Sequence, residues 1–216
     1  MSAYAPVVSV EELVDFASGS STLIERALDE NAPERRLVER ALAAAEGVGV
    51  RYLRWPADAP GLRVHARRDV LFSHGYGPDG ALFYPAVRPA VQYGSTSGTI
   101  ANGLLAVRSA RPYADAVTTY YAGYRGEGET TADLRAMPGL DGLAEDAVVP
   151  PLPPALFEAV AESAVAIATR VDSGLIGKRE STFNVTTSVR TTVRLERDAL
   201  AEIWDTYAQG FRVPVL

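Results

Sequence analysis

The feature that most constrains this chain is a long alternation of side chains near its C-terminus. From Ser181 to Leu195, over fifteen residues, apolar or threonine side chains alternate with polar or charged ones. A period of two is typical of a strand with one buried face. Ordinary strands have about 5 or 6 residues, so this segment predicts either two strands joined by a bend or one strand that pairs with another chain. The apolar face is expected to carry Phe183, Val185, Val189 and Val193, with Thr187, Thr191 and Leu195.

The composition is that of an ordinary globular protein and argues against several functions. The 216 residues, 47% of them hydrophobic, suffice for one domain or for one domain with a large insertion. Because there is no cysteine, we expect neither disulfides nor thiolate metal sites, which suits a reducing compartment. The net charge of −6 argues against sequence-independent DNA binding. The first residues lack a secretory leader and no run of about 18 apolar residues occurs, which predicts a cytosolic protein without membrane contact.

The first 54 residues predict short helices. Ser9 and Glu12 have the spacing of a capping box at the start of a helix over 10–17. A second helix is expected over 22–31, and a third from Pro33, because proline suits the first helical position. Gly47 and Gly49 weaken the third helix, so the residues after them form either a helix end or a strand; we favour the helix. The expected apolar stripes are Leu23, Ala27 and Leu28 in the second helix and Leu37, Val38, Ala41, Leu42 and Ala45 in the third.

The middle of the chain predicts a small antiparallel sheet or barrel. Residues 70–74 and 81–84 are rich in β-formers and flank a glycine-rich connection, the pattern of a hairpin. Three further strands are expected over 90–94, 103–108 and 116–124. An acidic loop over 126–150 follows, and loops of this length are usually functional or mobile.

The last segment predicts two helices and an extended arm. Pro150 to Pro154 lead into a helix with an apolar stripe, whose small residues over 159–168 permit close approach of another helix. A final helix carries Trp204 on its apolar face and is followed by Gly210. Six residues remain as an apolar tail that Pro214 keeps from being helical: Phe211, Arg212, Val213, Pro214, Val215 and Leu216.

Together these segments predict an α+β fold in one domain. We expect a helical bundle made of the N-terminal helices (1–54) and two C-terminal helices (151–216), a β-rich antiparallel insertion (55–125), the acidic loop (126–150) and the extended C-terminal arm.

Reactive groups are scarce, so we expect no enzyme, no cofactor and no metal site. His65, Asp69 and His74 form the only local cluster of metal-binding side chains, at spacings that match no known motif, and surface positions explain them better. Gly177-Lys178 lacks both the leading glycine and the following Ser or Thr of a phosphate loop. The tyrosines at 113, 120, 121 and 124 could stack nucleic-acid bases, but without a basic groove a strand core or a subunit contact is the better interpretation.

The order of these segments resembles a known family. The resemblance rests on the segment Tyr84-Pro-Ala-Val-Arg-Pro-Ala-Val91, the strand end Val117-Thr-Thr-Tyr-Tyr-Ala-Gly-Tyr124, a proline-led helix from Leu152, and the Gly174-Leu-Ile turn before the Ser/Thr-rich strand. In this order the chain resembles the head-to-tail connector, or adaptor, family of tailed bacteriophages and gene-transfer particles.

The resemblance implies a structural role in the phage neck. Such adaptors form a ring, commonly of about twelve subunits, which docks under the portal protein and extends the channel through which double-stranded DNA passes without sequence-specific binding. Residues 211–216 would be the arm that binds the portal, and Phe183, Val185, Val189 and Val193 would pair with a neighbouring subunit or face the stopper or tail terminator. The protein would then be located in the virion neck, assembled in the cytoplasm of the host bacterium.

Two alternatives stay open. The chain would be a tail-completion or head-closure protein of the same neck if its arm binds a tail-side partner. From a different class, it would be a small-molecule enzyme or binding protein with a pocket in the β-rich middle, around His65, His74 and Tyr76.

Overall fold

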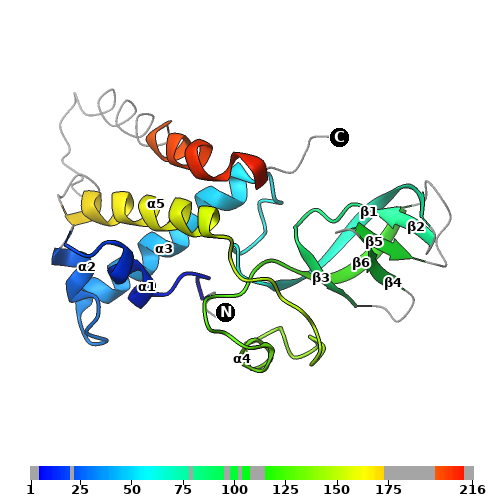
Figure 1. Ribbon diagram of the computed structural model, residues 1–216, viewed down its shortest axis with the longest axis horizontal. Coiled ribbons are helices and arrows are strands. Elements are labelled where there is room, and N and C mark those ends of the chain that lie inside the picture. Colours follow the sequence, from blue (N-terminus) through cyan, green and yellow to red (C-terminus); the bar gives the residue numbers. More distant parts are fainter. Residues whose placement is uncertain are drawn as a thin grey trace, which may run out of the picture. The chain divides into compact units, whose positions relative to one another are not determined.

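The chain folds into two compact units, each made of segments distant in the sequence. The computed structural model describes residues 5–19, 22–77, 80–94, 98–101, 104–107, 115–172 and 198–211, for some strand residues by the backbone alone. Unit 1 comprises Met1–Val7 and Trp55–Leu152, and unit 2 comprises Val8–Arg54 and Pro153–Leu216. Unit 1 carries the strands and unit 2 most of the helical residues, which confirms the expected α+β class (Figure 1).

The N-terminal helices of unit 2 begin where the sequence predicts. Helix α1 (Val10–Phe16) starts with the capping box: the Ser9 hydroxyl accepts a hydrogen bond from the Glu12 backbone N–H at 3.1 Å, and the Glu12 carboxylate accepts one from the Ser9 N–H at 2.6 Å. Helix α2 (Thr22–Arg26) is shorter than expected, because the chain continues in turns to Asn31. Leu23 and Ala27 are buried, but Leu28 is 52% exposed, so its place in the apolar stripe was wrong.

Helix α3 (Pro33–Tyr52) begins at the predicted proline and continues through both glycines. At Gly49 the missing side chain is required, since a Cβ atom there would overlap the Trp204 ring. At Gly47 a Cβ would meet nothing within 4 Å. The helix therefore persists because one of its glycines admits a tryptophan from a distant segment.

Two further helical segments complete unit 2. Helix α5 (Pro154–Asp172) packs on α3 through its small residues; Ala159, Ala161 and Ala164 are buried. The final helix is described over 198–208 and passes into the 3-10 turn η1 (Gln209–Phe211). Its Trp204 is wholly buried, with the ring 5.7 Å from that of Tyr52 in α3.

Unit 1 is built on a six-stranded antiparallel sheet in the order β3-β6-β1-β2-β5-β4. Its strands are β1 (His65–Gly77), β2 (Gly80–Phe83), β3 (Ala90–Tyr93), β4 (Gly98–Ala101), β5 (Leu104–Val107) and β6 (Asp115–Ala122). The predicted hairpin is present, with Gly77 opposite Gly80, and the longest ladder joins β1 to β6 from His65↔Ala122 to Phe72↔Asp115. The edge strands β3 and β4 also contact each other, so the sheet curls back on itself. Strand β4 was not predicted.

The expected acidic loop contains part of the core of unit 1. It includes helix α4 (Thr131–Arg135), which Thr130 and Asp133 cap as a second capping box. Its apolar residues pack against Val64 and against Tyr121 of β6; the buried ones are Leu134, Leu140, Leu143 and Val149. The segment is thus a packed element of unit 1, although its acidic side chains Glu127, Asp141 and Asp146 are exposed, as expected of solvated charges.

Candidate functional site

Most of the predicted partner-binding residues lie outside the described part of the chain. This applies to the alternating segment with Phe183, Val185, Val189 and Val193, and to residues 212–216 of the tail. Phe211 is described: it ends η1 and is 38% exposed, unusually open for a phenylalanine. The structure therefore places only the first residue of the predicted arm.

The point from which this arm departs is firmly fixed within unit 2. Trp204 is buried against Tyr52 and Gly49 of α3, and the Tyr52 hydroxyl donates a hydrogen bond to the Asp205 carboxylate at 2.6 Å. Apolar packing of Trp204 and a hydrogen bond to Asp205 thus help to hold the final helix on α3. Phe211 follows six residues after Asp205, at the end of an anchored element.

A buried polar network lies on one face of β1 in unit 1. Arg67 and Asp69 share that face because they are two residues apart, and Tyr120 of β6 is opposite Arg67 in the ladder. Arg67 donates to both carboxylate oxygens of Asp69, at 2.8 and 3.2 Å, and the Tyr120 hydroxyl donates to the same carboxylate at 2.6 Å. A second carboxylate, on the exposed Asp58, accepts from Arg67 at 3.2 Å. The expectation that Asp69 lies on the surface was wrong.

This network shifts the ionisation of all three groups. The hydrogen bonds that Arg67 donates to Asp69 raise the pKa of Arg67 against the effect of its burial. Burial raises the pKa of the Asp69 carboxyl, but hydrogen bonds from Arg67 and Tyr120 outweigh this, so that its pKa is lowered overall. Burial, reinforced by Asp69, raises the pKa of Tyr120. At pH 7 the network therefore holds an ion pair and a neutral phenol, an arrangement that suits structure better than proton transfer.

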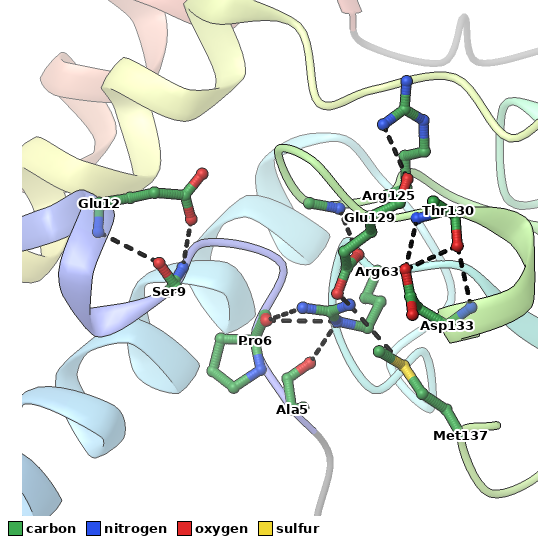
Figure 2. Close-up of polar contacts among 11 residues, drawn as sticks. Ala5, Pro6, Ser9, Glu12, Arg63, Arg125, Glu129, Thr130, Asp133 and Met137 are labelled. Carbon is green, nitrogen blue, oxygen red and sulfur yellow. Dashed lines mark hydrogen bonds and ion pairs between the residues drawn. The ribbon is translucent and has the colours of Figure 1, made fainter. Parts of the chain in front are cut away.

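A second buried arginine, Arg63, binds the N-terminal segment to the rest of unit 1 (Figure 2). Its Nε donates to the carbonyl oxygen of Ala5 at 2.9 Å, its Nη2 donates to that of Pro6 at 2.5 Å, and its Nη1 pairs with the Glu129 carboxylate. Glu129 in turn accepts from the Gly126 N–H at 2.6 Å. Arg63 is only 8% exposed, so these partners satisfy a charge that is costly to bury alone.

His65 lies at the start of β1, beside Arg63. Its Nδ1 is 2.8 Å from the Arg63 carbonyl oxygen, which can only accept, so we assign the proton to Nδ1. Burial lowers the pKa of the ring, which favours its neutral form. Its Nε2 is buried and has no hydrogen-bond partner among the residues described. The prediction that His65 is a surface residue was therefore wrong; for His74 only the backbone, in β1, is described.

A cavity of about 350 Å³ opens next to these residues, within unit 1. Its walls come from the N-terminal segment, the start of β1 and the turn after α4. The lining is mostly apolar: Ala5, Pro60, Val64, Ala66, Met137, Pro138, Gly139 and Leu140, with Arg63 and His65 as the polar members. Its volume falls in the lower part of the range of small-molecule sites.

Metal-binding side chains do not cluster among the described residues. These residues contain no group of three or more His, Cys, Asp or Glu side chains placed to hold a metal ion. Nor is any described helix both long and apolar enough to cross a membrane.

Tyr120, Tyr121 and Tyr124 are buried, which confirms their interpretation as strand core, whereas Tyr113 lies outside the described residues.

Comparison with known proteins adds no relative. No family model matches the chain, and no similar protein is found among curated proteins or solved structures.

Proposed function

We propose that this protein is a structural adaptor of a bacteriophage neck, a ring that joins the portal to the tail and extends the DNA channel. The observation that carries the proposal is the anchored final helix with the exposed Phe211 at its end. The sequence that follows is apolar at Val213, Val215 and Leu216. An apolar segment that leaves a fixed point suits insertion into a partner, where each buried side chain contributes about 1.5–3 kcal/mol.

Two further features support the same role. The net charge of −6 disfavours adhesion to the phosphates of passing DNA. The alternating segment over 181–195 would supply strand pairing between subunits, and repetition around a ring multiplies weak contacts. In this proposal the partners are the portal protein, neighbouring copies and a tail-side neck protein.

The test compares assembly and portal binding of two variants. Replacing Val213, Val215 and Leu216 together by serine keeps the length of the arm and removes its apolar surface. We expect the affinity for the portal protein of the same particle to fall by at least tenfold, since three buried side chains are lost. The matched control is Phe16→Ser, which removes an exposed aromatic side chain elsewhere in unit 2 and should leave portal binding unchanged.

Solution mass and negative-stain images of the purified protein give the second measurement. A ring, alone or on mixing with the portal, is the expected result. A monomer under both conditions, together with portal binding that the serine variant leaves intact, would refute the adaptor. Binding of the arm to a tail-side protein in place of the portal would instead identify a tail-completion or head-closure protein.

A further inference from the structure

The cavity in unit 1 has a chemical character specific enough to name the class of molecule it would hold. Eight of its ten lining residues are apolar or glycine, so most of a bound molecule would contact hydrocarbon. Its volume of about 350 Å³ exceeds what one bare ring needs, since a cavity of about 150 Å³ already holds benzene, so a substituted ring or a fused pair of rings fits. Met137 in the wall is unbranched, and such side chains adapt their position to a ligand.

The polar members of the lining differ in what they can offer. Arg63 already donates to the carbonyl oxygens of Ala5 and Pro6 and pairs with Glu129, as Figure 2 shows. An anionic ligand would have to displace these partners, which disfavours a carboxylate or a phosphate. His65 is different, because its Nδ1 proton is directed to the Arg63 carbonyl and its Nε2 keeps an acceptor lone pair.

That lone pair is the only buried side-chain acceptor in the lining that has no partner among the described residues. A buried acceptor left unpaired costs free energy, which a donor on a bound molecule recovers. We propose that the cavity binds a small neutral ring compound that carries one hydrogen-bond donor, with the donor on Nε2 of His65 and the ring against Met137 and Leu140. The inference does not depend on the proposed function.

The N-terminal segment gives the site a wall of its own. Ala5 lines the cavity, and Arg63 holds the carbonyl oxygens of Ala5 and Pro6. Binding is therefore expected only while this segment is in place, so the full chain is the right material for the test.

The experiment uses phenol as the probe and toluene as its match, since toluene has the same ring without the donor. The ¹⁵N-labelled full chain is titrated with each compound while the amide signals of Val64, Gly139 and Leu140 and the imidazole nitrogens of His65 are followed. Phenol should shift these amides, move the Nε2 signal towards that of a hydrogen-bonded nitrogen, and bind about tenfold more tightly than toluene, as expected of one hydrogen bond.

Two variants isolate the acceptor. His65→Phe should weaken phenol binding about tenfold and leave toluene binding unchanged, whereas His74→Phe, at the other histidine, should change neither. Equal affinity for phenol and toluene would overturn the proposal, and so would equal phenol binding by the wild type and His65→Phe. The proposal would also fail if phenol did not shift the amide signals of Val64, Gly139 and Leu140. If His65→Phe does not fold, the Nε2 signal of the wild type decides the matter, because without a shift on phenol addition the assignment fails.

Discussion

In unit 2, segments far apart in the sequence meet chiefly through apolar side chains, whereas in unit 1 buried arginines join such segments in addition to an apolar core. The final helix of unit 2 is placed by Trp204, which fits against Gly49 of α3. In unit 1, Arg63 joins the N-terminal segment to Glu129, and Arg67 joins β1 to Asp58. The difference is one of geometry: a helix pair needs matching volumes, while irregular segments beside a sheet leave backbone carbonyls that need donors.

The comparison indicates how each unit should respond to change. Unit 2 should be sensitive to side-chain volume and largely insensitive to pH. Unit 1 should be sensitive to the loss of a single buried charge, because the group that was paired with this charge would stay buried. The predictions below test this contrast.

The largest effect is expected in unit 1 for Arg63→Met, which keeps the side-chain length and removes the donors. The carboxylate of Glu129 would lose its charged partner and two carbonyl oxygens would lose a donor, at a cost of about 3–5 kcal/mol. Urea unfolding measures the loss, and amide exchange should show it over 5–7 and 126–137. The control is Arg135→Met, whose ion pair with Glu145 is at the surface and worth at most about 1 kcal/mol. Equal losses in the two variants would show that the burial of the Arg63 charge does not decide the stability of unit 1.

The next largest effect is expected when the two glycines of α3 in unit 2 are replaced one at a time by alanine. Gly49→Ala forces a methyl group into the Trp204 ring and should destabilise unit 2 by about 3 kcal/mol, in the upper range for overpacking. The methyl group added by Gly47→Ala meets nothing within 4 Å. This variant should stabilise unit 2 by about 1 kcal/mol, because alanine favours the helix. The thermal unfolding midpoints of the two variants distinguish them. If both alanines stabilise, the packing of Trp204 on α3 is not as described.

Local sequence signals predicted α1, α3 and α5 well, whereas α4 was missed and α2 is shorter than expected. Ser9 with Glu12 marks the start of α1, Pro33 that of α3, and the small apolar stripe of α5 predicts its packing. Each signal involves neighbours within four residues, so it needs no knowledge of the tertiary fold. Leu28 was misplaced because the helix before it ends early, at Arg26.

The sheet and the polar sites were less predictable because they depend on distant partners. The strands β3, β5 and β6 were recognisable, but their order, with β6 between β3 and β1, depends on long-range pairing. The leucines over 134–143 follow no period, so their burial was missed. Arg63 and Arg67 resemble surface arginines, and nothing in the local sequence indicates that Glu129 or Tyr120 will meet them.

An intermediate effect with a pH dependence is expected for Tyr120→Phe in unit 1. The variant removes a donor from Asp69, a hydrogen bond to a charged group worth about 2 kcal/mol. Because the pKa of Asp69 is lowered in the folded state, its contribution is present above the unfolded value of about 3.9 and is lost as the pH falls through and below it. The difference between wild type and variant should therefore be full at pH 7 and narrow below about pH 4.

Tyr124→Phe is the matched control for that titration. Tyr124 is also buried, but burial alone raises its pKa to about 12, so its hydroxyl stays neutral across the acidic range. Urea midpoints at a series of pH values should show a constant difference for this variant. A Tyr120→Phe difference that is also constant with pH would show that Asp69 does not depend on the phenol.

The smallest effect compares the two capping boxes, one in each unit. Ser9→Ala removes the cap of α1 and should cost about 1 kcal/mol, with faster amide exchange confined to the first turn. Thr130→Ala does the same to α4, a helix of five residues that contributes only Leu134 to the core. Because α1 buries three side chains, Val10, Leu13 and Val14, it should stay folded when its cap is lost, whereas α4 should exchange along its whole length. If α1 loosened as completely as α4, apolar packing would not be what holds the helices of unit 2.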